Sequence, residues 1–297
     1  MTVHDGNKAG NNSLIKAASV ASVLVALTLI TVKSWVWFLT GSLSVLASLV
    51  DSLLDAIASL INMLAIRYSM KSADRDHPFG HGKAEYLAGL GQSLFIGCSA
   101  VFVIMKAIER LIDPQPLTCT FVGVGVMIFA VVVTGGLVFF QSRVVARTGS
   151  MAIKADSLHY AADLFTNLGT VTALVLAWLG WPFFDPFIAV VIGLVVLYNA
   201  WQIGYESSQL LMDCQLSPEM EKRISDIALA HEHVVGVHDI KTRLSGKTRL
   251  IQMHLEMEGD IPLNEAHRIT KEVEAEIHNT IPDADVIIHQ DPAERVM

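Results

Sequence analysis

Long stretches of apolar residues, separated by short polar segments, fill the first two thirds of the chain. A helix that crosses a bilayer needs about 20 consecutive, mostly apolar residues. Six stretches reach that length and contain few charged side chains. They predict an all-α bundle of six transmembrane helices, over residues 14–39, 43–66, 84–111, 119–142, 152–179 and 184–206.

The pattern changes after residue 212, where apolar positions recur at the spacings of short helices and strands. Pro218 and Pro262 each stand at the start of a segment with helical periodicity. Residues 235–243 and 248–258 alternate between apolar and polar positions around a Ser-Gly turn, before a final short apolar run. The order αββαβ predicts a small two-layer α+β domain, of the ferredoxin-like or metallochaperone-like type.

Charge marks the same boundary. Residues 1–212 hold 12 basic and 12 acidic side chains, whereas residues 213–297 hold 9 basic and 17 acidic ones and therefore carry the whole net charge of −8. Seven of the 11 histidines also lie after residue 212. We therefore divide the chain into a polar N-terminal tail (1–13), a transmembrane domain (14–212) and an acidic, histidine-rich C-terminal domain (213–297).

Composition excludes several classes of protein. Hydrophobic residues make up 52% of the chain and charged residues only 17%, so the chain is neither disordered nor typical of a soluble domain. The negative net charge argues against nucleic acid as a partner. Three widely separated cysteines, at positions 98, 119 and 214, cannot frame a disulfide scaffold or a zinc ribbon.

Basic residues predict the orientation in the membrane, because cytoplasmic loops are enriched in lysine and arginine. Three basic residues lie on the predicted outer side, namely Lys33, Lys106 and Arg110. Nine lie on the other side, namely Lys8, Lys16, Arg67, Lys71, Arg75, Lys83, Arg143, Arg147 and Lys154. This asymmetry predicts that both termini of a multi-pass protein face the cytoplasm.

Two pairs of ionisable residues lie well inside predicted membrane helices. Asp51 and Asp55 share the second stretch, and His159 and Asp163 share the fifth, each pair at a spacing of four residues that places both side chains on one helix face. One charged carboxylate at the bilayer centre costs about 2.5–3.5 kcal/mol. A divalent cation held between the helices would offset that cost, and four nitrogen and oxygen ligands suit tetrahedral zinc or a similar ion.

Simpler explanations exist for each residue alone. A single membrane histidine is commonly a hydrogen-bonded core residue, and a single aspartate can relay protons or pair with a lysine. Neither explains two such pairs on separate helices. The absence of a thiolate near these pairs in the sequence argues against copper(I).

Two further clusters of candidate ligands lie outside the predicted spans. Asp74, His77 and His81 fall within eight residues and are separated by proline and glycine, so they can converge on one ion or belong to a solvated polar loop. The C-terminal domain offers a second set that can support a binuclear site or consist of exposed histidines, namely His238, His254, His267, His289 and Asp291.

Together these motifs resemble those of the cation diffusion facilitators, most closely the bacterial zinc and ferrous-iron efflux pumps. The likeness covers almost the whole chain after the first dozen residues. It rests on the paired Asp51…Asp55 and His159…Asp163, on Asp74…His77-Pro-Phe-Gly-His81-Gly-Lys83-Ala-Glu85, and on His289-Gln290-Asp291-Pro292.

The resemblance implies a proton-coupled antiporter that exports a divalent metal, namely Zn²⁺ or else Fe²⁺, Cd²⁺ or Co²⁺, from the cytoplasm across a bacterial inner membrane. Its partners are then protons, the lipid bilayer and a second copy of the chain in a homodimer. No organic cofactor is expected. Metal would be both the substrate and a structural or regulatory ion in a cytoplasmic metal-binding dimerisation domain.

The resemblance also implies roles for individual residues. Asp51, Asp55, His159 and Asp163 would form the transport site, and Asp74, His77 and His81 the loop site. The five C-terminal ligands would form a binuclear site that holds two C-terminal domains together. Lys83 and Asp213 would form a charge interlock between the domains, and Leu158 an apolar gate beside the transport site.

Two other classes of function compete with efflux. A membrane metalloenzyme such as an intramembrane protease usually shows His-Glu-x-x-His and an open coordination position, but this sequence lacks the motif and four ligands would close the site. A membrane metal sensor would use the C-terminal ligands and leave the buried quartet unexplained. We therefore expect a secondary active transporter and no enzyme.

Overall fold

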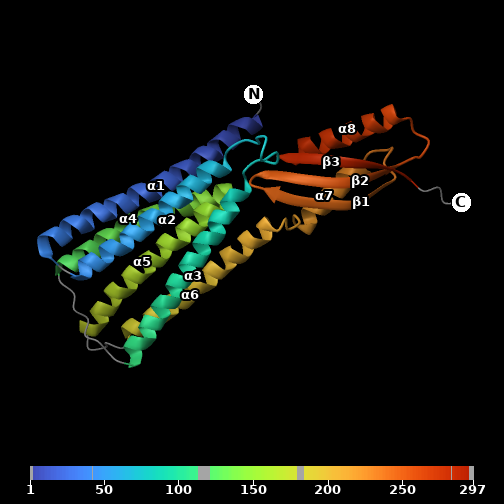
Figure 1. Cartoon of the computed structure of the whole chain (residues 1–297). Helices are drawn as coiled ribbons and strands as arrows, with labels where there is room; N and C mark the ends of the chain where they lie inside the picture. Colours follow the sequence, from blue (N-terminus) through green and yellow to red (C-terminus); the bar gives the residue numbers. More distant parts are fainter. Residues whose placement is uncertain (1–2, 42, 113–120, 179–183, 282, 294–297) are drawn as a thin grey trace. The chain divides into compact units, whose positions relative to one another are not determined.

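The computed structural model describes residues 3–41, 43–112, 121–178, 184–281 and 283–293 (Figure 1). These residues form two compact units. The first unit comprises Met1–Met70 and Ala84–Ser208, and the second comprises Lys71–Lys83 and Gln209–Met297. The loop after the second helix thus groups with the C-terminal residues, whereas the boundary at residues 212 and 213 stays a prediction.

Six long helices make up the first unit. Each overlaps one of the predicted apolar stretches, and they are α1 (Val3–Thr40), α2 (Leu43–Ser69), α3 (Lys83–Ile112), α4 (Phe121–Thr148), α5 (Met151–Trp178) and α6 (Phe184–Leu211). The first helix continues back through the predicted polar tail as far as Val3, because extending an existing helix costs far less than nucleating one.

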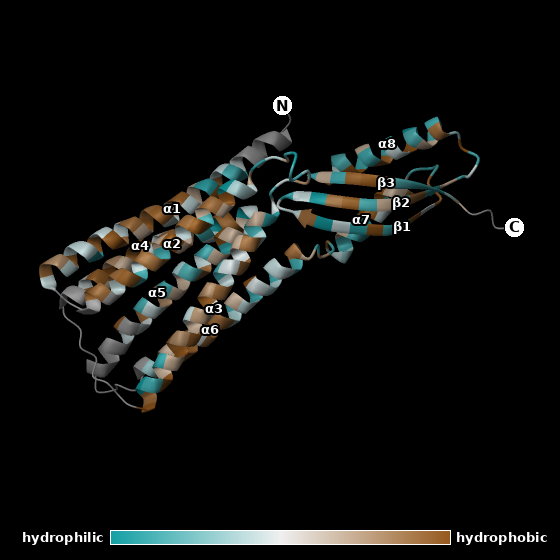
Figure 2. Ribbon diagram, in the orientation of Figure 1, coloured by the Kyte–Doolittle hydropathy of each residue, from teal (hydrophilic) through white to brown (hydrophobic). Residues whose placement is uncertain are grey.

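Much of the ribbon of these helices has the colour of hydrophobic residues in Figure 2, and many of their large apolar side chains are exposed. Trp35, Phe38, Phe102 and Trp201 are among the large apolar side chains that are more than half exposed. Patches of this extent are rare on soluble monomers, and here they are the surface that lipid chains would cover.

Five of the helices have a described segment long and apolar enough to cross a membrane: Gly10–Thr40, Ser48–Ser69, Lys83–Ile112, Val124–Thr148 and Pro186–Leu211. The described part of α5 does not meet this criterion, because Lys154, Asp156 and Asp163 all lie within it. The structure therefore shows a helical membrane region, and the sixth span stays a prediction.

The second unit contains a three-stranded sheet and two helices. Their order is the predicted αββαβ: α7 (Pro218–Leu229), β1 (Gly236–Ser245), β2 (Thr248–Met257), α8 (Leu263–Thr280) and β3 (Ala284–Pro292). Strand β2 lies in the centre, antiparallel to β1 and parallel to β3. The predicted small C-terminal α+β domain is thereby confirmed.

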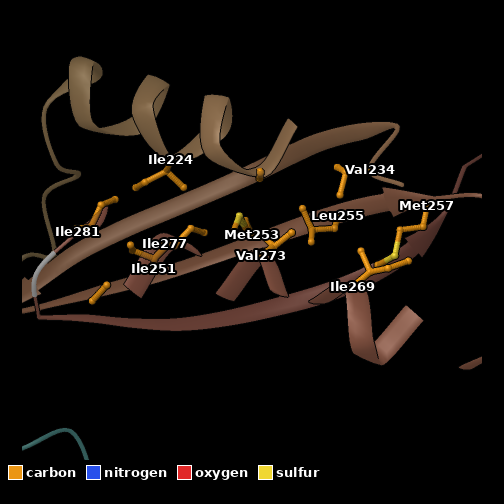
Figure 3. Packing of buried hydrophobic residues seen from close by; sticks show 12 residues of the cluster. Ile224, Val234, Ile251, Met253, Leu255, Met257, Ile269, Val273, Ile277 and Ile281 are labelled. Carbon is orange, nitrogen blue, oxygen red and sulfur yellow. The ribbon is translucent and has the colours of Figure 1, made fainter. Parts of the chain in front are cut away.

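The core of this unit lies between the helices and one face of the sheet (Figure 3). Alternate residues of β2, namely Ile251, Met253, Leu255 and Met257, are buried there with Ile224 of α7 and Ile269, Val273 and Ile277 of α8. Because side chains alternate across a strand, His254 faces the opposite side of the sheet. The helices therefore leave the histidine-bearing face uncovered.

Candidate metal sites

The first group of candidate ligands joins α2 to α5. The Nε2 atom of His159 lies 2.9 Å from Oδ1 of Asp55 and 3.8 Å from Oδ2 of Asp163. One ligand atom from each of the three residues lies within 4.8 Å of the other two. Because His159 and Asp163 are four residues apart on α5, both project toward Asp55 from one helix face.

This group lies inside the helical unit. His159 is only 6% exposed, and its ring lies 6.0 Å from the ring of Phe95 and 5.5 Å from that of Tyr160. Two carboxylates and one imidazole in such surroundings are expensive to leave without a cation. Oxygen and imidazole nitrogen are ligands that zinc and iron(II) accept.

Asp51, the predicted fourth ligand, lies one turn before Asp55 on α2 and is exposed. Its carboxylate does not belong to the group of Asp55, His159 and Asp163 that the structure brings together. Its role as a ligand stays a prediction. A divalent ion bound to the other three residues would attract it, and an aspartate one helical turn away can turn toward that ion by changing its rotamer.

A groove of about 860 Å³ runs between α2 and α3 beside this group. Leu54, which precedes Asp55, and Phe95, which contacts the His159 ring, both line it. Asn62 and Gln92 supply polar atoms farther along the groove. The groove therefore passes close to the ligand group, whose own three residues do not line it.

Sequence reasoning missed two charged residues close to the group. Asp156, one turn before His159 on α5, is completely buried. Its Oδ2 accepts hydrogen bonds from Ser22 at 2.5 Å and Gln141 at 2.6 Å, and its Oδ1 accepts one from Gln92 at 3.3 Å. These donors come from α1, α4 and α3, so one carboxylate ties α5 to three other helices.

The second missed residue is Lys33, which we predicted to lie near the outer end of the first span. The structure places it inside the bundle on α1, only 8% exposed. A charged residue within a predicted apolar stretch was the available signal for both Lys33 and Asp156, because such residues are functional candidates by default.

Asp74, His77 and His81 do converge in the loop that precedes α3. Oδ1 of Asp74 lies 3.3 Å from Nδ1 of His77, and Oδ2 lies 3.3 Å from Nε2 of His81. The backbone N–H of His77 donates a 2.7 Å hydrogen bond to the Asp74 carboxylate, which holds the pKa of that group below its ordinary value. An ionised carboxylate and two imidazoles are ligand types that bind divalent cations such as zinc.

The third group forms on the uncovered face of the sheet. Strand register aligns His238 with His254 and His254 with His289, so three histidines lie in a row across β1, β2 and β3. Oδ2 of Asp291 lies 2.8 Å from Nδ1 of His254 and 3.3 Å from Nε2 of His238. A hydrogen bond from His254 lowers the pKa of Asp291, which favours its ionised form.

The remaining predicted C-terminal ligands differ in position. His289 lies 3.3 Å from Asp291 but is 68% exposed at its side chain, and His267 is exposed on α8. Because α8 packs against the opposite face of the sheet, His267 does not join the other ligands in the described part of one chain.

Sequence reasoning also missed Glu256, whose carboxylate lies 3.0 Å from Nδ1 of His238. Glu256 is two residues after His254 on the same strand face, which was the signal for it.

The predicted charge pair forms within the second unit. Nζ of Lys83 lies 2.8 Å from Oδ1 of Asp213, and Nη1 of Arg243, which the sequence did not single out, lies 3.0 Å from Oδ2. Partial burial acts to raise the pKa of Asp213, but hydrogen bonds from Lys83 and Arg243 outweigh it and keep the pKa below its ordinary value. Whether the pair joins two domains stays a prediction.

Close backbone packing holds the ligand loop against the β1–β2 hairpin. A Cβ atom at Gly82 would lie 2.5 Å from the backbone nitrogen of Gly246, so glycine is required at this contact. Ser245 Oγ donates a 3.4 Å hydrogen bond to the carbonyl of Phe79. The loop ligands are thereby positioned by the C-terminal sheet.

Leu158, the predicted gate residue, packs against an apolar cluster of α3 and α6 that includes Ile96, Ala100 and Val196. It is adjacent to His159 in sequence, but successive helical residues point in different directions. Its role as a gate stays a prediction.

Comparisons with known proteins identify both parts of the chain. The family model of the cation efflux transmembrane domain matches residues 19–212, and that of the cation efflux protein, cytoplasmic domain, matches residues 216–293. A solved structure of CzrB is 33% identical and covers 27% of this chain and 99% of that chain, with a TM-score of 0.26.

Curated relatives match along nearly their whole length. The cation-efflux pump FieF of Salmonella arizonae is 47% identical over 279 residues, which cover 94% of this chain and 93% of that protein. FieF of Cronobacter sakazakii is 48% identical over the same shares. These relatives are pumps, which confirms the expectation of a transporter and no enzyme. The chain belongs to the cation efflux family, the cation diffusion facilitators that its motifs resemble.

Proposed function

We propose that the protein is a proton-coupled antiporter that exports Zn²⁺ from the cytoplasm, with Fe²⁺, Cd²⁺ and Co²⁺ as further substrates. The observation that carries this proposal is the convergence of Asp55, His159 and Asp163 inside the helical unit. Two carboxylates and an imidazole together form a ligand set that suits a divalent metal cation. Asp51, one turn away on α2, completes a tetrahedral set when the metal is present.

Competition between protons and metal explains the coupling. Carboxylates and imidazole must be deprotonated to bind metal, so each bound ion displaces protons from the same atoms. His159 is the main proton carrier, because its Nε2 faces both carboxylates and histidine titrates near neutral pH. A site exposed alternately to the two sides then loads metal from the cytoplasm and protons from outside.

The membrane placement follows from composition and charge. We place six helices across the bacterial inner membrane, with α5 as the sixth span, because its polar residues face ligands and buried partners. The excess of basic residues beside one set of helix ends supports cytoplasmic termini.

The second unit binds metal and dimerises. His238, His254 and Asp291 hold one ion, and His289 and His267 complete a binuclear site in the homodimer. Ions at this exposed face would stabilise contacts between two C-terminal domains. The loop ligands bind a further ion, while Lys83 and Asp213 link the domains and Leu158 closes the path beside the transport site.

Uptake of metal into vesicles that contain purified protein tests the transport function. With an imposed pH gradient, the wild type should accumulate Zn²⁺ and at least one of Fe²⁺, Cd²⁺ and Co²⁺. Asp55→Asn should reduce uptake to the level of empty vesicles because it removes an anionic ligand. Glu109→Gln, which changes an exposed carboxylate at the end of α3, serves as the matched control and should retain uptake. Wild-type uptake by Asp55→Asn would contradict the assignment of the site, and uptake that ignores the pH gradient would contradict proton coupling.

A further inference from the structure

A lysine side chain lies buried among the membrane helices. Lys33 is on α1, about two turns before the end of the helix at Thr40, and only 8% of its surface is exposed. Its Nζ donates hydrogen bonds to the Ser52 hydroxyl at 2.7 Å and to the Ser48 carbonyl at 3.0 Å, both on α2. The ammonium is therefore held at a defined place against the helix that carries Asp51 and Asp55.

These hydrogen bonds do not neutralise the charge, because both acceptors are uncharged. A charged lysine inside the apolar part of a membrane is unfavourable unless a nearby negative charge compensates it. A glutamine or a serine could form hydrogen bonds with α2 at a lower desolvation cost, because neither side chain carries a charge. The positive charge itself therefore requires an explanation beyond helix packing.

The negative charges that act on Lys33 are those of the candidate transport site. Ser52, which accepts the hydrogen bond from Lys33, directly follows Asp51 on α2 and lies three residues, almost one helical turn, before Asp55. A positive charge that attracts these carboxylates necessarily repels a cation bound between them. In surroundings of low dielectric constant such a repulsion extends over several ångströms and is weakly screened.

We infer that the Lys33 ammonium is a fixed positive charge that weakens the hold of the transport site on its divalent ion and so speeds release of that ion. The inference rests on the proposed function. Three carboxylates and an imidazole without an opposing charge would bind zinc too tightly for rapid turnover, since a transport site must also let its cargo leave. When the site is empty, the same charge lowers the energy of the unoccupied carboxylates.

A purely structural role predicts a different pattern. If Lys33 only clamps α1 to α2, any side chain that donates to Ser52 should suffice, and metal affinity should be unaffected. Lys33→Gln retains a donor but removes the charge, whereas Lys33→Arg retains the charge, which arginine carries at every relevant pH. The two variants therefore separate charge from hydrogen bonding.

The experiment measures Co²⁺ and Zn²⁺ binding to the full-length protein. Asp74→Ala and Asp291→Ala are included in every sample so that the loop and C-terminal groups do not contribute. Lys33→Gln should bind both ions about tenfold more tightly, as expected of losing one charge in surroundings of low dielectric constant. Lys33→Arg should stay within about twofold of the parent, since the charge is unchanged. Lys106→Gln, at the exposed end of α3, is the control for a change of net charge and should have no effect.

Transport kinetics provide the second readout. Zinc uptake by Lys33→Gln should show a lower KM together with a lower maximal rate, because slow release limits turnover. Lys33→Met, which removes both the charge and the donor, should tighten binding in the same way, and thermal unfolding checks that each variant is folded.

Unchanged or weaker metal binding in folded Lys33→Gln and Lys33→Met would overturn the inference. Failure of the proposed function is a different result, since the parent would then show no metal binding that Asp55→Asn removes. Tighter binding in Lys33→Arg equal to that in Lys33→Gln would also overturn it, because the effect would then depend on shape.

Discussion

The membrane group and the sheet group use similar ligands in opposite surroundings. In each, an aspartate oxygen lies 2.8–2.9 Å from a histidine nitrogen. His159 is buried between helices, whereas His238 and His289 are exposed at the edge of a sheet. Water can solvate the sheet group when it is empty, but the membrane group needs protons, metal or a fixed countercharge.

The two groups also converge by different means. Strand register places His238, His254 and His289 in one row, so backbone hydrogen bonds determine the sheet group. Asp55 meets His159 only because α2 packs near α5, so side-chain packing determines the membrane group. This difference implies that changes in helix packing should affect the membrane group and leave the sheet group intact.

The largest expected effect separates the two groups directly. Asp163→Ala should abolish proton-driven zinc uptake into vesicles, because it removes a ligand of the transport site. Asp291→Ala should keep most of the uptake per folded protein and instead weaken the metal-dependent dimer, measured by analytical ultracentrifugation with and without Zn²⁺. Equal losses of uptake in both variants would remove the functional distinction between the groups.

The next effect concerns the packing that supports the membrane group. Asp156→Asn places an amide among the donors of Ser22, Gln92 and Gln141, and should destabilise the bundle by about 1–3 kcal/mol. Adding Gln141→Glu exchanges carboxylate and amide across one hydrogen bond and should recover much of the loss. Thermal unfolding of the purified protein measures both.

A failure of the double variant to recover stability would show that the carboxylate must reside on α5. Metal binding by the C-terminal group should be unchanged in both variants. A parallel loss there would contradict the independence of the two groups.

A smaller effect concerns selectivity. His159 is the nitrogen ligand in the membrane group, and imidazole suits zinc and iron, whereas all-oxygen sites suit manganese. His159→Asp should therefore lower zinc uptake relative to manganese and shift its pH dependence to lower pH, since unperturbed aspartate titrates about 2.6 pH units below histidine. Initial uptake of each metal over a pH series measures this. An unchanged metal preference and pH profile would make His159 a core residue.

The smallest effect lies outside the membrane. The pKa of Asp213 is below its ordinary value of 3.8, so its interactions with Lys83 and Arg243 stabilise the folded state at neutral pH and are lost as the pH falls through the lowered pKa. Asp213→Asn should destabilise this region by about 1 kcal/mol or less at pH 7, because the group is partly exposed. Faster hydrogen exchange of residues 71–83 at pH 7, with a smaller difference near pH 3, is the expected result. Equal hydrogen-exchange rates of residues 71–83 in Asp213→Asn and in the wild type at pH 7 would contradict this prediction.

Much of the fold could be predicted from local pattern. Apolar length and two-residue alternation are properties of neighbouring residues, so they predicted the six long helices and the αββαβ order. The four-residue spacing of His159 and Asp163 also predicted that these two side chains share one helix face. The loop ligands were predictable for the same reason, since they lie within eight residues.

Only the tertiary structure decided what depends on packing between distant segments. It buried Lys33 and Asp156, placed Glu256 beside His238, and brought Arg243 to Asp213. In the described part of one chain, Asp51 and His267 do not lie within the ligand groups, and their roles as ligands stay predictions. The sequence by itself determined which side chains share a helix or strand face, because that follows from local backbone geometry. Which faces meet depends on helix packing and strand register, and these are set by contacts between residues far apart in the chain.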